Sequence, residues 1–395
     1  MAGEIEVDIH KILLADEERF SPFAKKSVDS LGRCHPIDHD PFRLEFARDE
    51  TRILHSRPFR RLKHKTQVFL SPDDDHICTR MEHVLHVSSI AAVIGRCLNL
   101  NTDLINAIAK GHDLGHPPFG HSGERVLNNI IVNDKEKDNK ASGGFKHEIH
   151  GLRVVDKLTN YGAGLNLTYE VRDGIATHCG ENFQRIVCPD RSRDLHKLDL
   201  LDDRNSMPAT LEGCLVRLVD RIAYLGRDLE DAIKARLIKK DDIPPEVAQR
   251  LGTDNGRIIG VFANDTIANS VGKDQIEMSK EIFELMEALR KFNYEYIYRH
   301  KDVERVSEKA DKMLRMLFYE LEGIYEASDH GRNTSRVDSV VKASPVLETF
   351  FRFSKNTNYT DEVKPWRVVA DYVAGMTDHF AEKTFTQLFM PSPFV

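Results

Sequence analysis

The sequence predicts an all-α protein. Apolar residues recur at spacings of three and four over most of the 395 residues, whereas the alternation typical of strands is confined to short runs such as residues 67–70. The chain is 41% hydrophobic and 30% charged, as ordinary globular proteins are, and no apolar run approaches the roughly 18–20 residues that cross a bilayer. No segment has the composition of an interdomain linker, so we expect one compact helical domain with appended C-terminal helices.

The individual helices are predicted from the positions of apolar and capping residues. In residues 81–98 apolar side chains recur at helical spacing, and Asn101-Thr102-Asp103 then provides a cap for a helix over residues 104–110. The clearest helix covers residues 210–237, where leucines and isoleucines form one continuous stripe. Further helices are predicted at 148–158, 276–289, 303–325 and 366–388, and loops at 133–144, 188–208 and 328–337.

Charge and cysteine usage restrict the class of protein. The net charge of −7 disfavours broad non-specific nucleic-acid binding. A basic cluster in residues 52–65 is either a solvated face or a binding surface for a polyanion such as a triphosphate. The six cysteines include no C-x-x-C pair, which predicts reduced thiols and neither a disulfide framework nor a thiolate zinc site. Residues 1–8 lack the features of a signal peptide, so we expect a cytoplasmic protein.

Histidine is concentrated in one part of the chain, since eight of the 18 lie between residues 76 and 150. The densest segment, 111–124, reads Gly-His-Asp-Leu-Gly-His-Pro-Pro-Phe-Gly-His-Ser-Gly-Glu. His112 and Asp113 are adjacent, so their side chains reach one ion only at a helix end or an irregular turn, which the neighbouring glycines permit. With His83 and Asp220 they would supply two nitrogens and two oxygens, a ligand set for a divalent ion.

Each of these residues also has a purely structural interpretation. The adjacent His and Asp would cap a helix end, and His83 would be a core histidine. Asp220 would form a buried salt bridge with Arg217 or Arg221. The density of histidines and carboxylates in residues 111–124 favours the metal-site interpretation.

The order of His83, His112-Asp113 and Asp220 resembles the signature of the HD superfamily. Further motifs resemble its deoxynucleoside triphosphate (dNTP) triphosphohydrolase branch, the dGTPase family, and lie at 56–63, 65–69, 79–83, 111–124, 211–213, 216–224 and 371–378. The resemblance implies an HD-domain helical bundle with appended C-terminal helices. It also implies a single HD-type phosphohydrolase domain over residues 1–395, with an HD core at about 50–235 and a C-terminal helical part at about 260–390.

The resemblance further implies roles for individual residues. The ligands of a divalent metal, which would be Mn²⁺, Mg²⁺, Fe²⁺, Ni²⁺ or Zn²⁺, would be His83, His112, Asp113 and Asp220. The catalytic pair would be His121 and Glu124, which lie three residues apart and therefore on one face of a helical turn. Residues 298–300 resemble a further phosphate-side segment. The substrate would be bound by Arg80, His116, Gln67, His147, Tyr224, Asp228 and Arg221.

The activity that the resemblance implies is metal-dependent hydrolysis of dNTPs, either dGTP or several of them, to a deoxynucleoside and inorganic triphosphate. Two alternatives stay open. One is another HD-type nucleotide phosphohydrolase, such as a phosphodiesterase, a 5′-nucleotidase or an alarmone hydrolase. The other is a catalytically silent nucleotide-sensing scaffold. Glu82 and His86 differ from the Thr and Glu that are frequent at these places in bacterial relatives, which leaves the preferred base open.

The resemblance also implies partners. We expect a homo-oligomer, as large as a hexamer, and a dNTP that acts as an allosteric effector. Single-stranded DNA is a partner of some relatives, but the net charge of −7 disfavours it here. We expect no membrane association.

Overall fold

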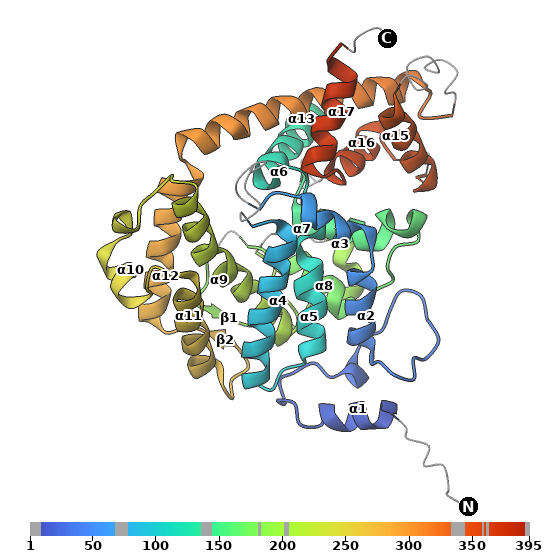
Figure 1. Cartoon of the computed structure of the whole chain (residues 1–395). Helices are drawn as coiled ribbons and strands as arrows, with labels where there is room; N and C mark the ends of the chain where they lie inside the picture. Colours follow the sequence, from blue (N-terminus) through green and yellow to red (C-terminus); the bar gives the residue numbers. More distant parts are fainter. Residues whose placement is uncertain are drawn as a thin grey trace, which may run out of the picture.

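The computed structural model describes residues 9–67, 78–135, 144–180, 183–200, 205–332, 344–357, 359–360 and 363–391. Within these residues the all-α prediction is confirmed (Figure 1). The helices of the first half are α1 (Ile9–Glu17), α2 (Glu45–Leu54), α3 (Arg57–Arg61), α4 (Arg80–Cys97), α5 (Thr102–Gly111), α6 (Gly120–Asn129), α7 (His147–Arg153) and α8 (Tyr169–Thr177). The second half contains α9 (Leu211–Lys234), α10 (Pro245–Arg250), α11 (Asn255–Ser270), α12 (Lys280–Asn293), α13 (Lys301–Ala327), α15 (Pro345–Asn356), α16 (Pro365–Ala374) and α17 (Asp378–Phe389). Two short strands, β1 (Ile186–Val187) and β2 (Ile276–Glu277), pair antiparallel.

The helices begin where the sequence provides caps. Thr79 and Glu82 form a capping box at the start of α4. The side chains of Asn101 and Thr210 accept hydrogen bonds from the first turns of α5 and α9. The long apolar stripe predicted at residues 210–237 is the buried face of α9, which the structure places at Leu211–Lys234. Local sequence therefore determines these helices and their N-terminal ends.

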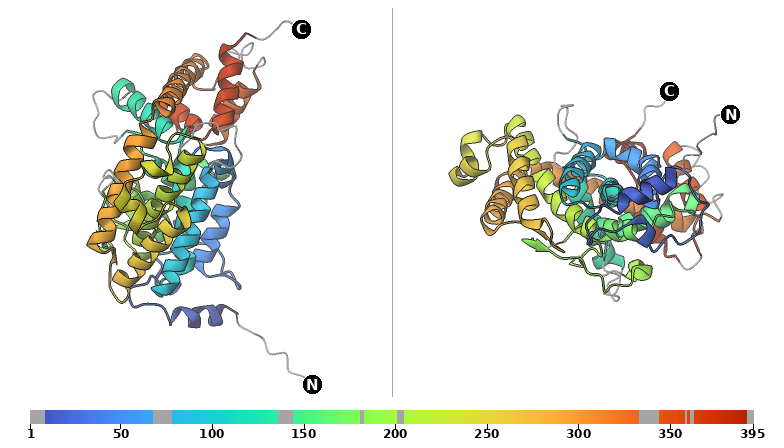
Figure 2. Two further views of the ribbon diagram at one scale, coloured as in Figure 1. Left: turned by 60° about the vertical axis from the view of Figure 1, so that its left-hand side comes forward. Right: turned by 90° about the horizontal axis from the view of Figure 1, so that it is seen from below.

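Two hydrophobic clusters hold the described part of the chain together. The larger lies among α2, α4, α5, α8 and α9 and extends to α11 and α12. The smaller lies among α6, α13, α15 and α16. Figures 1 and 2 show the long α13 running from the α12 side of the molecule across to α6 and the C-terminal helices. The His-rich segment passes between the clusters, since Leu114 packs in the larger and Phe119 in the smaller.

Two predicted helices are wrong in part. The prediction at 276–289 fails at its start, because residues 276–277 pair with β1 and α12 begins only after Ser279, whose side chain accepts a hydrogen bond from Ile282 N. The single helix predicted at 366–388 is two helices, because α16 ends at Ala374 with Gly375 as its C-cap and Thr377 caps a new helix, α17. The helix predicted at 148–158 is α7 followed by a π-helix, Val154–Leu158. The strand-like run at 67–70 and the three predicted loops fall partly outside the described residues.

The structure also bears on two further predictions: the state of the cysteine thiols and the presence of membrane-spanning helices. All six cysteines are free thiols, as predicted. Across the part of the chain that the structure describes, each helix is too short or too polar to cross a lipid bilayer.

Buried polar contacts join the C-terminal helices to the His-rich segment. Asp378, the first residue of α17, accepts hydrogen bonds from Phe119 N (3.0 Å), from Thr66 N (2.9 Å) and from the Thr66 hydroxyl. The buried Lys65 ammonium donates to the carbonyl of His116 and to that of the last residue of α16. Because Phe119 has a left-handed backbone (φ 62°), the bond to its N–H helps to hold an unfavourable turn.

We expect Asp378→Ala to lower the free energy of unfolding by about 2–4 kcal/mol. The substitution leaves two buried N–H groups without their acceptor, and an unpaired buried donor costs on the order of 1–3 kcal/mol. Urea denaturation followed by circular dichroism measures the change. The control is Lys383→Ala, an exposed position on the same helix. Equal stability of the two variants would show that Asp378 is not a structural link.

Glu212, in the first turn of α9, is a buried acid that ties the N-terminal region to the larger cluster. Its Oε1 atom accepts hydrogen bonds from Lys25 N (3.0 Å) and Asn101 N (3.1 Å). Its Oε2 atom has no hydrogen-bond partner among the described residues. Burial raises the pKa of this carboxyl to about 7, so the group is neutral over most of the acidic range.

This raised pKa predicts a pH-dependent stability. Because the folded pKa lies above the usual value of 4.5, the stabilisation from the neutral acid is complete below about pH 4.5 and is lost as the pH rises through 7. Glu212→Gln keeps an acceptor but cannot ionise. We therefore expect it to match the parent protein near pH 5 and to exceed its stability by about 1–3 kcal/mol near pH 8. Chemical denaturation at both pH values tests this, and the exposed Glu246→Gln should show no such difference.

Candidate active site

The four residues predicted as metal ligands come together from three elements. His83 lies on α4 and Asp220 on α9, while His112 and Asp113 open the short 3₁₀ helix His112–Gly115 at the end of α5. His83 Nε2 is 2.9 Å from Asp220 Oδ1, and His112 Nε2 is 3.6 Å from both Asp220 Oδ1 and Asp113 Oδ1. The irregular turn that the adjacent His and Asp require is therefore present.

The protonation of His112 fits a bound cation. Its Nδ1 atom lies 2.6 Å from the carbonyl oxygen of Ala109, and a carbonyl only accepts, so Nδ1 carries the hydrogen. The lone pair is then on Nε2, which is buried without a hydrogen-bond partner among the described residues. A free imidazole lone pair beside two carboxylates is a donor set that a divalent ion would complete.

The contacts of Asp220 favour the metal-site interpretation over a salt bridge to arginine. Its carboxylate pairs with His83, whereas Arg217 donates to the backbone carbonyls of Thr177, Cys179 and Ser206. Burial opposes ionisation, but the hydrogen bond from His83 holds the pKa of the Asp220 carboxyl well below its usual range. The acid is therefore available as an anionic ligand.

Arg80 forms an ion pair with the Asp113 carboxylate and still has hydrogen-bond donors that are not used by the described residues. Its Nη1 donates to Asp113 Oδ2 at 2.8 Å, and both side chains are buried. Burial opposes ionisation, but Arg80 lowers the pKa of Asp113 well below its ordinary value. The Nε and Nη2 atoms of Arg80 have no partner within the described ranges. Gly120, at φ 55°, lets the guanidinium approach, since a Cβ there would lie 2.9 Å from Nη2.

The predicted catalytic residues His121 and Glu124 both lie on α6. A third residue, His147, contacts the same Glu124 carboxylate. His121 Nδ1 is 3.4 Å from Glu124 Oε2, and the His121 side chain is 78% exposed, whereas Glu124 is buried. His147, at the start of α7, places its backbone N 3.2 Å from Glu124 Oε1 and its Nδ1 3.0 Å from Oε2. Despite burial, the charge on Glu124 raises the pKa of His147 well above its ordinary value. One carboxylate thus orients two histidines.

These groups face one cavity of about 760 Å³. Of the predicted site residues, His112 and Glu124 lie behind its wall, and the others line it: Gln67, Arg80, His83, Asp113, His116, His121, His147, Asp220, Arg221, Tyr224 and Asp228. The volume falls in the range of roughly 300–1,000 Å³ that is usual for small-molecule sites. Residues from distant parts of the sequence therefore meet at one site.

The far wall of the cavity comes from α9 and the segment before α13. The Tyr298 hydroxyl donates to Asp228 Oδ2 at 2.5 Å, and burial raises the pKa of Asp228 to about 7. The Arg221 guanidinium lies 4.1 Å from the centre of the Phe183 ring. Tyr224, which lies between Arg221 and Asp228 in the sequence of α9, also lines the cavity. This wall combines aromatic faces with polar groups, as small-molecule sites do.

The structure adds His178 and Cys179, which sequence reasoning missed. His178 Nε2 is 3.3 Å from His147 Nε2, and the His178 ring centroid is 4.9 Å from that of His112. Both residues line the cavity. In the sequence they form an isolated His-Cys pair after α8, and only the fold brings them close to residues 112 and 147.

Comparison with known proteins gives the family. The HD domain matches residues 80–225, and the phosphohydrolase-associated domain matches residues 276–333 and 334–387. A deoxyguanosinetriphosphate triphosphohydrolase-like protein from Caldanaerobacter subterraneus subsp. tengcongensis is 41% identical over 374 residues, which are 95% of this chain and 93% of the relative. The chain belongs to the deoxyguanosinetriphosphate triphosphohydrolase-like family.

Other relatives carry the same description. The proteins from Desulfatibacillum aliphaticivorans and Clostridium perfringens are 39% and 35% identical, over 95% and 94% of this chain and 96% and 95% of the relatives. A solved structure of a hypothetical protein from Aquifex aeolicus covers 77% of this chain and 70% of its own at 20% identity and a TM-score of 0.35, a weak likeness. The family resemblance seen in the sequence is confirmed, and the chain is an HD-domain phosphohydrolase.

Proposed function

We propose that the protein hydrolyses deoxynucleoside triphosphates to a deoxynucleoside and inorganic triphosphate, with a divalent metal as cofactor. The observation that carries the proposal is the common cavity. Three of the four predicted ligands, His121 and Arg80, which has donors without partners among the described residues, line a space of about 760 Å³, and His112 and Glu124 lie directly behind its wall. The three relatives described above are named deoxyguanosinetriphosphate triphosphohydrolase-like proteins, which supports the choice of substrate class.

The residues that would hold the metal are His83, His112, Asp113 and Asp220. A divalent ion bound there would lower the pKa of water and polarise a phosphoryl oxygen, chemistry that serves phosphate hydrolysis. The two carboxylates supply the negative charge that such an ion needs, and their low pKa values keep them ionised at neutral pH.

The chain's own residues would bind and orient the triphosphate. Arg80 has two nitrogens without partners among the described residues, and His116 has an unpartnered Nδ1. Fixed donors such as the Arg80 guanidinium stabilise charge that develops on phosphoryl oxygens. Tyr224 and Asp228, one helical turn apart on α9, would face the sugar. Gln67 and His147 line the same cavity and complete the proposed contacts.

His121 would act as the general acid of the reaction. Its side chain is 78% exposed, and Glu124 holds its Nδ1 side, so Nε2 is directed away from the carboxylate. A histidine so placed would donate a proton to the departing 5′-oxygen. General acids of this kind contribute on the order of 10²–10⁴-fold in rate. The buried His147 shares the same carboxylate and would keep it ionised when His121 loses its proton.

The experiment is an assay of metal-stripped protein with each of the four dNTPs, with and without Mn²⁺ or Mg²⁺. Ion-exchange chromatography separates the products. We expect a deoxynucleoside and intact triphosphate, formed only with metal. Release of pyrophosphate or orthophosphate would instead indicate another HD-type phosphohydrolase. Absence of turnover, even with mixed dNTPs present as activators, would favour a nucleotide-sensing scaffold.

We also propose that the chain forms a homo-oligomer, as large as a hexamer, and that a dNTP acts as its effector. Mass photometry with and without dNTPs tests both points. A monomer whose mass and turnover do not respond to a second dNTP would contradict them.

A further inference from the structure

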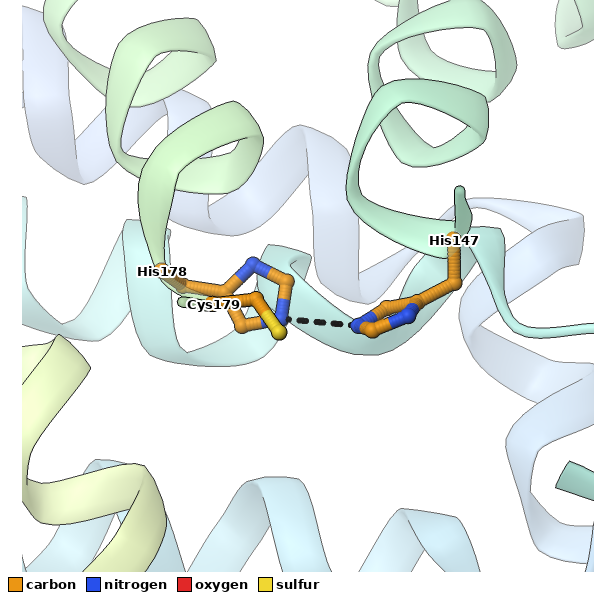
Figure 3. A group of neighbouring side chains, drawn as sticks. All are labelled: His147, His178 and Cys179. Atoms are coloured by element: carbon orange, nitrogen blue, oxygen red, sulfur yellow. Dashed lines mark hydrogen bonds between the residues drawn. The ribbon is translucent and has the colours of Figure 1, made fainter. Parts of the chain in front are cut away.

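We propose a second metal site, formed by His147, His178 and Cys179 and suited to a thiolate-preferring ion such as Zn²⁺. One atom of each residue, a ring nitrogen or the sulfur, lies within 4.8 Å of the other two. Figure 3 shows the two imidazole rings pointing toward each other, with the cysteine sulfur beside the space between them. This site borders the first one, because His178 also forms a group with His112 and Asp113 whose ligand atoms lie within 4.8 Å of one another.

The tautomers of the two histidines leave their lone pairs facing each other. His178 Nδ1 lies 2.8 Å from the carbonyl oxygen of Ile175, and a carbonyl only accepts, so Nδ1 carries the hydrogen. His147 Nδ1 likewise faces the carboxylate of Glu124 at 3.0 Å. Once His147 has released its extra proton, as metal binding requires, the two Nε2 atoms, 3.3 Å apart, are both acceptors. An electrophile must lie between them, and it is either a proton or a metal ion.

The distances and the third donor point to a metal ion. Zn–N bonds of about 2.0–2.1 Å at a tetrahedral angle place two ligand nitrogens about 3.3 Å apart. The measured separation of the Nε2 atoms is 3.3 Å. A shared proton would need no third group, whereas Cys179 brings a sulfur within 4.8 Å of both ring nitrogens. Thiolate with imidazole selects Zn²⁺ over Mg²⁺ or Mn²⁺, which prefer oxygen ligands.

The surroundings hold the three ligands in place. The Arg217 guanidinium, which is only 1% exposed, donates at 2.6 Å to the carbonyls of Thr177 and Cys179, on either side of His178. Each ligand histidine has its other ring nitrogen bonded to a carbonyl or a carboxylate, as metal-binding histidines usually do. All three ligands line the cavity, which provides a path for the ion.

Occupation of this site would have a consequence for the reaction, and this part rests on the proposed function. An ion on His147 takes the nitrogen that faces the cavity and fixes the histidine that shares Glu124 with His121. We therefore expect Zn²⁺ to inhibit turnover that Mn²⁺ supports. The assignment revises the expectation, drawn from the absence of C-x-x-C pairs, that no thiolate binds metal in this protein.

Metal binding without nucleotide tests the site independently of the reaction. Metal-stripped protein is dialysed against Zn²⁺, and bound zinc is measured by mass spectrometry. We expect two ions per chain, and we expect Co²⁺ to produce the charge-transfer absorbance of a cobalt–thiolate bond. In Cys179→Ser we expect this absorbance to disappear and the affinity for the second zinc to fall at least about 10-fold. Cys97→Ser, at an exposed cysteine on α4, should bind both ions as the parent does.

Three results would overturn the site: one zinc per chain in the parent protein, no cobalt–thiolate absorbance, or unchanged zinc affinity in Cys179→Ser. The first would mean that the two histidines share a proton. Cys179→Ala and circular dichroism check that the variants fold, since Arg217 holds the backbone there and not the thiol. Triphosphate release with Mn²⁺ is scored separately, so the proposed function and the second site can fail independently.

Discussion

Asp220→Asn is expected to lower kcat/KM for triphosphate release at least about 10³-fold. The Asp220 carboxylate contacts His83 and approaches His112, so it would be the oxygen donor that joins α9 to the other proposed ligands. An amide of the same shape lacks the negative charge and binds a divalent ion poorly. Loss of the ion removes several kcal/mol of transition-state stabilisation, and each 1.36 kcal/mol is tenfold in rate.

Two measurements separate loss of metal from loss of fold. Metal content by mass spectrometry should fall in Asp220→Asn, while circular dichroism should be unchanged because the amide can still hydrogen bond to His83. The control is Asp241→Asn, at an exposed position beyond α9 that does not line the cavity. Activity within about threefold of the parent in Asp220→Asn would remove Asp220 from the ligand set.

Arg80→Met is expected to lower the free energy of unfolding of the metal-free protein by about 3–5 kcal/mol. The Arg80–Asp113 pair is almost fully buried, with a separation of 2.8 Å between Nη1 and Oδ2. Removal of the arginine leaves the Asp113 charge buried without its partner, which is the costly way to break such a pair. Methionine has a similar length and keeps most of the packing, so the change reports mainly on charge.

The same variant provides a test of the metal site. A divalent ion bound at Asp113 would compensate the lost positive charge, so Mn²⁺ should stabilise Arg80→Met more than it stabilises the parent protein. Urea denaturation with and without Mn²⁺ measures the difference. Arg96→Met, at an exposed position near the end of the same helix, is the control. If the two variants were equally stable without metal, Asp113 would not be ionised in the folded protein.

The local parts of the fold could be predicted because their signals are local. The stripe of α9 and the caps at Asn101 and Thr210 depend on residues within one or two turns. The prediction at 276–289 failed because its first residues pair with β1, a partner about 90 residues away. At 366–388 the break was present in the sequence, as Gly375 followed by Thr377, but helical periodicity on both sides concealed it.

In the candidate site, too, the residues with a local sequence signal could be predicted and those brought together by long-range contacts could not. His112 and Asp113 could be recognised because they are adjacent and flanked by glycine, and the family resemblance supplied their partners. His178 and Cys179 have no such pattern, and nothing in their neighbourhood in the sequence points to His147. The division into an HD core at 50–235 and a C-terminal part at 260–390 stays a prediction, and α6 packs with the C-terminal helices although it lies inside the first range.

The sequence by itself determined the helical class, the helices with strong stripes and caps, and the kinds of residue available for chemistry. Tertiary structure alone decided which of those residues meet. Glu124 holds two histidines that lie 26 residues apart, and Asp378 closes the turn at Phe119 from the far end of the chain. The physical reason is the distance along the chain over which each kind of interaction acts. Helix formation is governed by neighbours along the chain, whereas a site is assembled by burial of apolar faces, which brings distant polar groups together and leaves them no solvent to pair with.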